Sequence, residues 1–119
     1  MTAEEQHADM VSCLIKDGET IRQELTPMDC RLIHAVMGVA GEAGELLDAI
    51  KKHTMYRKPL DLPNVIEELG DLEFFMQDIR EVLGITRDQT LEANIDKLSV
   101  RYPGMKYSDQ RAQFRADKK

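Results

Sequence analysis

The amino-acid sequence predicts an all-α fold of four to five helices, completed by homo-oligomerisation. Apolar residues recur at steps of three and four along much of the chain, which is the spacing of one helix face. The composition agrees, since the chain has seven methionines, no tryptophan and few clusters of β-branched residues. At 119 residues, the chain is long enough for one domain with a modest core.

The first half of the chain predicts short helices followed by one long helix. The segment from about Ala3 to Leu25 has helical periodicity that is interrupted around Gly18, which indicates one or two short helices. Thr26 suits the N-cap and Pro27 the first position of the next helix. This long helix is expected to end near His53.

The second half predicts two further helices and a tail. Asp61-Leu62-Pro63 starts a helix that should end at Gly84, because glycine readily adopts the left-handed conformation that follows a helix. A capping-box pattern at Thr86 predicts a last helix from Arg87 to about Arg101. We therefore assign residues 1–104 to one domain and residues 105–119 to a polar C-terminal tail.

Charge and composition argue against several classes of function. The formal net charge of −6 is unlike that of a general nucleic-acid binder. No apolar run approaches the ~18 residues of a membrane span, and the first residues are acidic, unlike a signal sequence. Cys13 and Cys30 lack zinc-motif spacing, which favours reduced side chains. We expect a cytoplasmic protein without nucleic-acid or membrane partners.

Two acidic pairs are the most informative motifs. Glu42 and Glu45 lie three residues apart on the long second helix, and Glu68 and Asp71 have the same spacing on the third. Residues at this spacing are about 60° apart around a helix, so each pair shares a face. If the two helices pack side by side, four carboxylates converge, and their mutual repulsion requires a cation between them.

Both pairs point along apolar or small faces. On a helical wheel, three apolar residues fall within about 40° of Glu68: Leu72, Phe75 and Ile79. The other pair shares its face with three small residues: Gly38, Gly41 and Ala49. One acidic pair alone usually marks a solvated face, but two pairs on inward faces favour a metal site. The oxygen ligands suit Mg²⁺, with Mn²⁺ as a possible substitute.

The last helix offers groups that could bind phosphates. Asn94, Lys97 and Arg101 lie within about 60° of one another on one face. An amide, an ammonium and a guanidinium together suit a polyphosphate, although the same strip could be an ordinary basic surface. Lys51 is a further candidate, although lysines near a helix C-terminus are also explained by the helix dipole.

These motifs together resemble the MazG-type all-α nucleoside triphosphate pyrophosphohydrolases. The family pattern of E-x-x-E, a spacer and E-x-x-D is similar to GEAGELLDAIKK followed by EELGDLEFF. The later ANIDKLSVRYP resembles the Asn-x-x-Lys-x-x-x-Arg segment that binds phosphates in the family. The ending KYSDQRAQFRADKK is more loosely similar to small bacteriophage members, which would place the protein in a host cytoplasm.

The resemblance implies Mg²⁺-dependent hydrolysis of a nucleoside triphosphate to the monophosphate and pyrophosphate, by a homodimer or a dimer of dimers. It implies metal ligation by Glu42, Glu45, Glu68 and Asp71, and phosphate binding by Asn94, Lys97 and Arg101. Glu42 and Glu45 are the expected catalytic pair, since one carboxylate not fully engaged with metal can act as the base.

Two alternatives remain open from the sequence. One is a non-catalytic helical module that binds nucleotides or mediates dimerisation, and the other is a pyrophosphohydrolase of a different pyrophosphate-containing metabolite. The apolar residues of the long helices spread more widely than one neighbour could cover, which is why we expect a second copy to complete the bundle.

Overall fold

The computed structural model describes residues 1–118, and over this range its regular secondary structure is all helical, with no strand. The elements in order are α1 (Ala3–Leu14), α2 (Gly18–Glu24), α3 (Pro27–Thr54), α4 (Leu62–Leu83), α5 (Arg87–Arg101), the 3₁₀ turn η1 (Pro103–Met105) and α6 (Asp109–Phe114). The expected all-α class is confirmed, and the first segment forms two short helices. Lys119, the last residue of the expected tail, lies outside the described residues.

Local capping explains where α3 begins. The Thr26 hydroxyl accepts from the Asp29 backbone N–H at 3.1 Å, and the Asp29 carboxylate accepts from the Thr26 N–H at 3.0 Å. Pro27 occupies the first turn, where its missing N–H costs nothing. These reciprocal bonds satisfy backbone donors that a helix start otherwise leaves free.

The later helices also begin and end at the expected residues. The Asp61 side chain caps α4 by accepting from the Asn64 N–H at 3.2 Å. Gly84 ends α4 with φ at 68°, the left-handed conformation that glycine adopts without a steric penalty. Thr86 opens a capping box for α5, which ends at Arg101.

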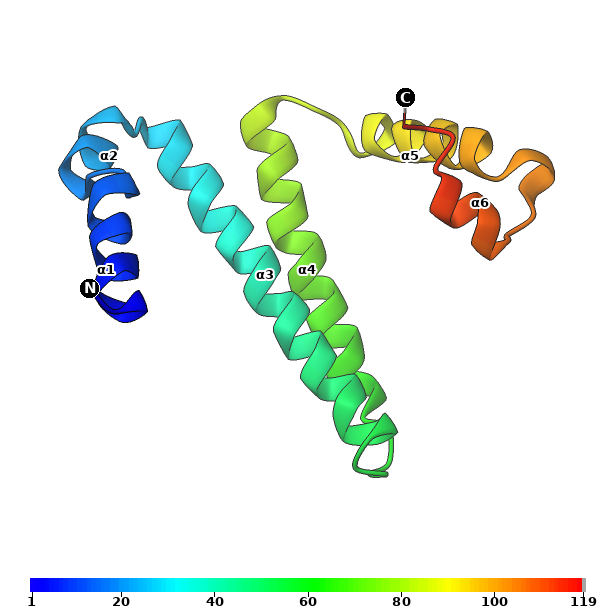
Figure 1. The fold of residues 1–119 in the computed structure, drawn as a ribbon. Helices are drawn as coiled ribbons and strands as arrows, with labels where there is room; N and C mark the ends of the chain where they lie inside the picture. Colours follow the sequence, from blue (N-terminus) through cyan, green and yellow to red (C-terminus); the bar gives the residue numbers. More distant parts are fainter. Residues whose placement is uncertain (119) are drawn as a thin grey trace.

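The centre of the molecule is an antiparallel hairpin of α3 and α4, and these helices make the main tertiary contact (Figure 1). Ala35 and Ala49 are its buried apolar residues, and Gly38 lets the Phe75 ring approach the α3 backbone. Near the end of the hairpin where α3 starts, Arg31 Nε donates to Asp78 Oδ1 at 2.9 Å. The small residues of α3 thus allow the two helices to pack closely.

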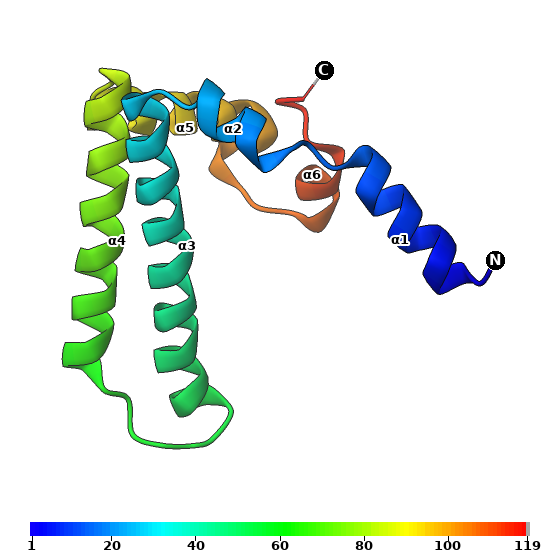
Figure 2. The same cartoon turned by 90° about the vertical axis from the view of Figure 1, so that its left-hand side faces the viewer.

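The remaining helices project from the hairpin as two arms. In Figure 1, α1 and α2 lie on one side of the hairpin and α5 with α6 on the other, whereas in the turned view of Figure 2 both arms extend to the same side. Within the tail, for which the sequence predicted no element, α6 forms and contacts α5, and η1 lies between these two helices in the chain. The protomer is consequently open, with a radius of gyration of 20.5 Å. Among residues 1–118, no helix combines the length and apolar character that crossing a membrane requires.

Candidate metal centre

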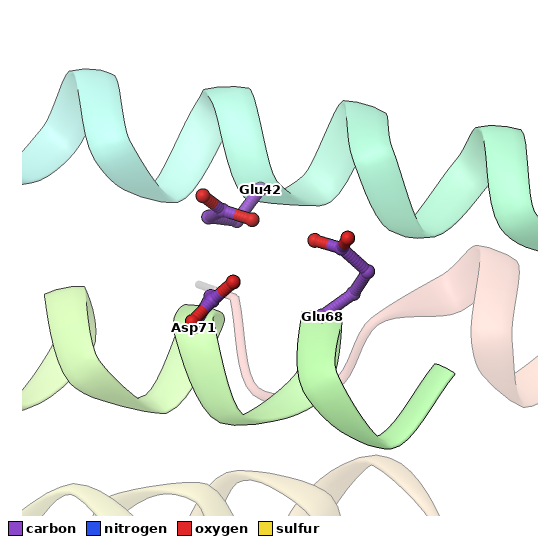
Figure 3. Close-up of side chains that lie close together, drawn as sticks. All are labelled: Glu42, Glu68 and Asp71. Carbon is purple, nitrogen blue, oxygen red and sulfur yellow. The ribbon is translucent and has the colours of Figure 1, made fainter. Parts of the chain in front are cut away.

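Three carboxylates converge between the two long helices. Glu42 extends from α3 toward Glu68 and Asp71 of α4 (Figure 3). One carboxylate oxygen from each residue lies within 4.8 Å of the others, and all three residues are partly buried. The i, i+3 spacing on α4 places Glu68 and Asp71 on the same side of that helix, facing α3. The hairpin thus brings both acidic motifs to one place.

The raised pKa and the unpartnered oxygen of Glu68 indicate that a cation would stabilise this site. The pKa of Glu68 is raised to about 7, first by a side-chain hydrogen bond with Glu42, then by desolvation, and then by the charges of Glu42, Glu45 and Asp71. Its Oε2 atom is buried without a hydrogen-bond partner. An orphaned carboxylate oxygen among other acids is costly, and a bound cation would satisfy it.

The donor set identifies the class of ion that fits. All three side chains offer carboxylate oxygens, which are hard ligands suited to a divalent cation such as Mg²⁺ or Mn²⁺. Among residues 1–118, no histidine or cysteine joins this cluster. The residues present therefore fit a hard divalent metal.

Glu45 lies at the edge of the cluster. It is exposed, and its carboxylate is not among the three that converge. Its negative charge nevertheless contributes to raising the pKa of Glu68, so it lies within electrostatic reach of the cluster. Glu45 is thus a carboxylate beside the candidate ligands that stays open to solvent.

The basic strip of α5 does not reach the carboxylates of the acidic cluster within this chain. α5 leaves the far end of α4 and lies beside the hairpin's end, whereas the acidic cluster is midway along α3 (Figure 1). Asn94 and Lys97 are exposed on α5, and Arg101 is partly buried. Lys51, also exposed, lies with its Nζ 5.6 Å from the centre of the Tyr56 ring. The basic strip of α5 and the acidic cluster therefore lie in separate parts of the chain.

The sequence reasoning missed one partner of the basic strip. Asp117 in the tail forms an ion pair with Arg101, with 2.7 Å between Oδ1 and Nε. No local pattern signals this contact, because the two residues are separated by η1, α6 and a left-handed turn at Arg115.

Comparison with known families gives a match to one of them. The model of the MazG nucleotide pyrophosphohydrolase domain matches residues 33–105, which is more than half of the chain. The matched range contains both acidic motifs and the basic strip. Comparisons with curated proteins and with solved structures found no match.

Proposed function

This chain belongs to the MazG nucleotide pyrophosphohydrolase family, and we propose that it hydrolyses a nucleoside or deoxynucleoside triphosphate to the monophosphate and pyrophosphate, using Mg²⁺. The observation that carries the proposal is the convergence of Glu42, Glu68 and Asp71, with one Glu68 oxygen left without a partner. A site of this composition matches a metal that neutralises phosphate charge.

In this proposal, Glu42, Glu68 and Asp71 hold the ion. Bound Mg²⁺ would neutralise charge on the triphosphate and lower the pKa of a nearby water, and Mn²⁺ could substitute for it. Glu45 takes the proton of the attacking water, because it is exposed and lies next to the ligands without being one of the three. Glu42, on the same helix as Glu45, contributes to hydrolysis as a metal ligand.

The reaction breaks the bond between the α-phosphorus and the bridging oxygen of the leaving pyrophosphate, as water oxygen bonds to the α-phosphorus. Asn94, Lys97 and Arg101 are proposed to bind the β- and γ-phosphates. Lys97 and Arg101 would stabilise the negative charge that develops on the leaving group. Lys51 is a further candidate for a phosphate contact. Because nucleoside triphosphates are part of the cytoplasmic nucleotide pool, we propose the cytoplasm as the location of the protein.

Because α5 lies away from the carboxylates of its own protomer, we propose that a homodimer or dimer of dimers completes the site. The shape of the protomer supports this. Its accessible surface is 9777 Å², whereas a compact monomer of 13.6 kDa exposes about 6,600 Å². Its radius of gyration of 20.5 Å exceeds the roughly 13.5 Å of a compact domain of this length.

The exposed apolar side chains define the surface for a second copy. Leu47 is 68 % exposed and Phe74 is 69 % exposed, on the two helices that also carry the acids. Other exposed apolar residues on these helices include Val36, Ile50 and Leu69. Burying them against the same helices of a partner would form a two-fold helical interface close to the acidic cluster.

The test is a screen of the purified protein with Mg²⁺ against canonical and damaged nucleoside triphosphates, following released pyrophosphate and the nucleotide product. Monophosphate and pyrophosphate in equal amounts are expected for at least one substrate. Nucleotide binding without turnover would indicate a non-catalytic module. Turnover confined to another pyrophosphate-containing metabolite would reassign the substrate and leave the chemistry unchanged.

A further inference from the structure

The C-terminal tail folds back onto the end of α5 and is held there at two points. Arg111 Nη1 donates to the Pro103 carbonyl at 2.8 Å, which ties α6 to η1. At Arg115 the backbone turns through a left-handed conformation with φ at 52°. The Lys118 N–H donates back to the Arg115 carbonyl at 2.8 Å, closing this turn. The turn directs Asp117 toward α5.

The second attachment is a two-pronged ion pair between Asp117 and Arg101. Arg101 Nε donates to Oδ1 at 2.7 Å and Nη2 donates to Oδ2 at 3.1 Å. The Asp117 side chain is only 5 % exposed and that of Arg101 16 %. The guanidinium holds the pKa of Asp117 below its ordinary value, so the carboxylate is charged at neutral pH. Asp117 therefore covers the donor edge of Arg101.

The same place contains a cleft of about 380 Å³ between α5 and the tail. Its lining residues are Asp96, Lys97, Val100, Ala116, Asp117 and Lys118. The volume lies within the range of small-molecule sites, ~300–1,000 Å³. Lys97 and Lys118 line this cleft together with the acids Asp96 and Asp117, and Asp117 in turn pairs with Arg101, which is not a lining residue. An anion that displaced Asp117 would therefore gain access to Arg101 beside Lys97.

We propose that Asp117 is an internal competitor for the anion site of Arg101, and that it sets the affinity with which this site binds substrate phosphate. This inference rests on the proposed role of Arg101 as a phosphate ligand. Carboxylates and phosphates bind a guanidinium with the same parallel pair of N–H···O bonds, so only one of them can occupy the edge that Asp117 now covers. A polyphosphate displaces Asp117 because it also engages Lys97, which a single carboxylate cannot match.

The size of the effect follows from the fraction of molecules in which Arg101 is free. Apparent affinity falls in proportion to that fraction. We therefore expect Asp117→Asn to bind inorganic pyrophosphate, in the presence of Mg²⁺, more tightly than the parent by at least about twofold. Isothermal titration calorimetry measures this directly and needs no turnover.

Asp109→Asn is the matched control. Asp109 is another tail acid, and it accepts from the Tyr107 hydroxyl at 2.6 Å. This variant should bind pyrophosphate like the parent, because it removes the same charge from the tail without freeing Arg101. Asp117→Ala serves as a second variant, and circular dichroism of all proteins checks that helix content is retained.

A double-mutant cycle tests whether Asp117 acts through Arg101. In the Arg101→Gln background, Asp117→Asn should leave pyrophosphate affinity unchanged, because the competed site is gone. The proposal is overturned if Asp117→Asn binds pyrophosphate no tighter than the parent, or if the gain persists without Arg101. Tighter binding by a protein that hydrolyses no nucleotide would uphold this inference and refute the proposed function. If the parent hydrolyses nucleotides but Asp117→Asn binds pyrophosphate no more tightly than the parent, the proposed function would stand and this inference would be refuted.

Discussion

The ring of Phe75 on α4 lies directly against the backbone of Gly38 on α3. A β-carbon built at residue 38 would be 2.4 Å from Phe75 Cδ1, a distance at which one of the two must move. Gly38 is one helical turn before Glu42, and Phe75 is one turn after Asp71. This contact therefore helps to set the separation of the two helices next to the acidic cluster.

The first prediction is that Gly38→Ala both destabilises the protein and weakens Mg²⁺ binding. Alanine in a helix interior ordinarily stabilises by up to about 1 kcal/mol, but here the clash with an aromatic ring should outweigh that gain and cost about 1–3 kcal/mol. Denaturant unfolding and a Mg²⁺ titration measure the two effects.

Gly44→Ala is the control for this prediction, because nothing lies within 4 Å of a β-carbon at that position. It should be as stable as the parent or more so. Adding Phe75→Leu to Gly38→Ala makes room for the methyl group and should restore part of the Mg²⁺ affinity. Equal stability of Gly38→Ala and Gly44→Ala would show that the contact does not limit helix separation.

The second prediction concerns the orphaned oxygen of Glu68. Mg²⁺ should raise the melting temperature of the parent by several degrees through binding to the folded state. Glu68→Gln should lose this rise and the hydrolytic activity while keeping helix content, and without metal above neutral pH it should be at least as stable as the parent. Glu73→Gln removes an exposed carboxylate of α4 that lies 3.8 Å from Arg80, outside the acidic cluster, and it should keep both the Mg²⁺-dependent rise and the activity. A Glu68→Gln enzyme with parental activity would rule out the carboxylate site.

The third prediction is a pH dependence with a defined sign. The folded-state pKa of Glu68 is about 7 against an ordinary value of 4.5, so between these values the folded state binds more protons than the unfolded state. Its contribution to metal-free stability is present below pH 4.5 and is lost as the pH rises to about 7. Denaturation curves across this range should show the decline, and Glu68→Gln should lack it.

Mg²⁺ binding should follow the opposite trend, because the ion and the proton compete for Glu68. Affinity should rise with pH by up to about tenfold per unit and level off above the pKa of Glu68. Calorimetric titration at several pH values measures this. An affinity independent of pH on both sides of neutrality would exclude Glu68 as a ligand.

The fourth prediction concerns which bond breaks. Since the proposed water attacks the α-phosphorus, hydrolysis in ¹⁸O-enriched water should label the nucleoside monophosphate alone. Mass spectrometry of the products measures the label. Label in inorganic phosphate, with a nucleoside diphosphate as co-product, would place the attack at the terminal phosphorus instead.

The fifth prediction concerns assembly. Sedimentation equilibrium at low micromolar concentration should show a dimer or tetramer, because the exposed apolar faces of α3 and α4 are costly in water. Leu47→Glu should shift the equilibrium toward smaller species. A single species of 13.6 kDa for the parent would contradict the proposal that a second copy completes the site.

The sequence alone determined where α3, α4 and α5 begin, where α4 ends, and the acidic motifs. Thr26, Asp61 and Thr86 begin helices, and Gly84 ends one, because capping bonds and backbone conformation depend on neighbours a few residues away. The i, i+3 spacing within a helix likewise places Glu68 and Asp71 on one face before any packing is known.

Only the tertiary structure decided which distant groups meet. The packing of α3 on α4 joins Glu42 to Glu68 and Asp71 and leaves Glu45 exposed at the edge. The turn at Arg115 brings Asp117 to Arg101. Such contacts depend on loop conformation and on the separation of packed helices, which reflect the summed packing of many side chains. A local sequence pattern therefore does not predict these long-range contacts.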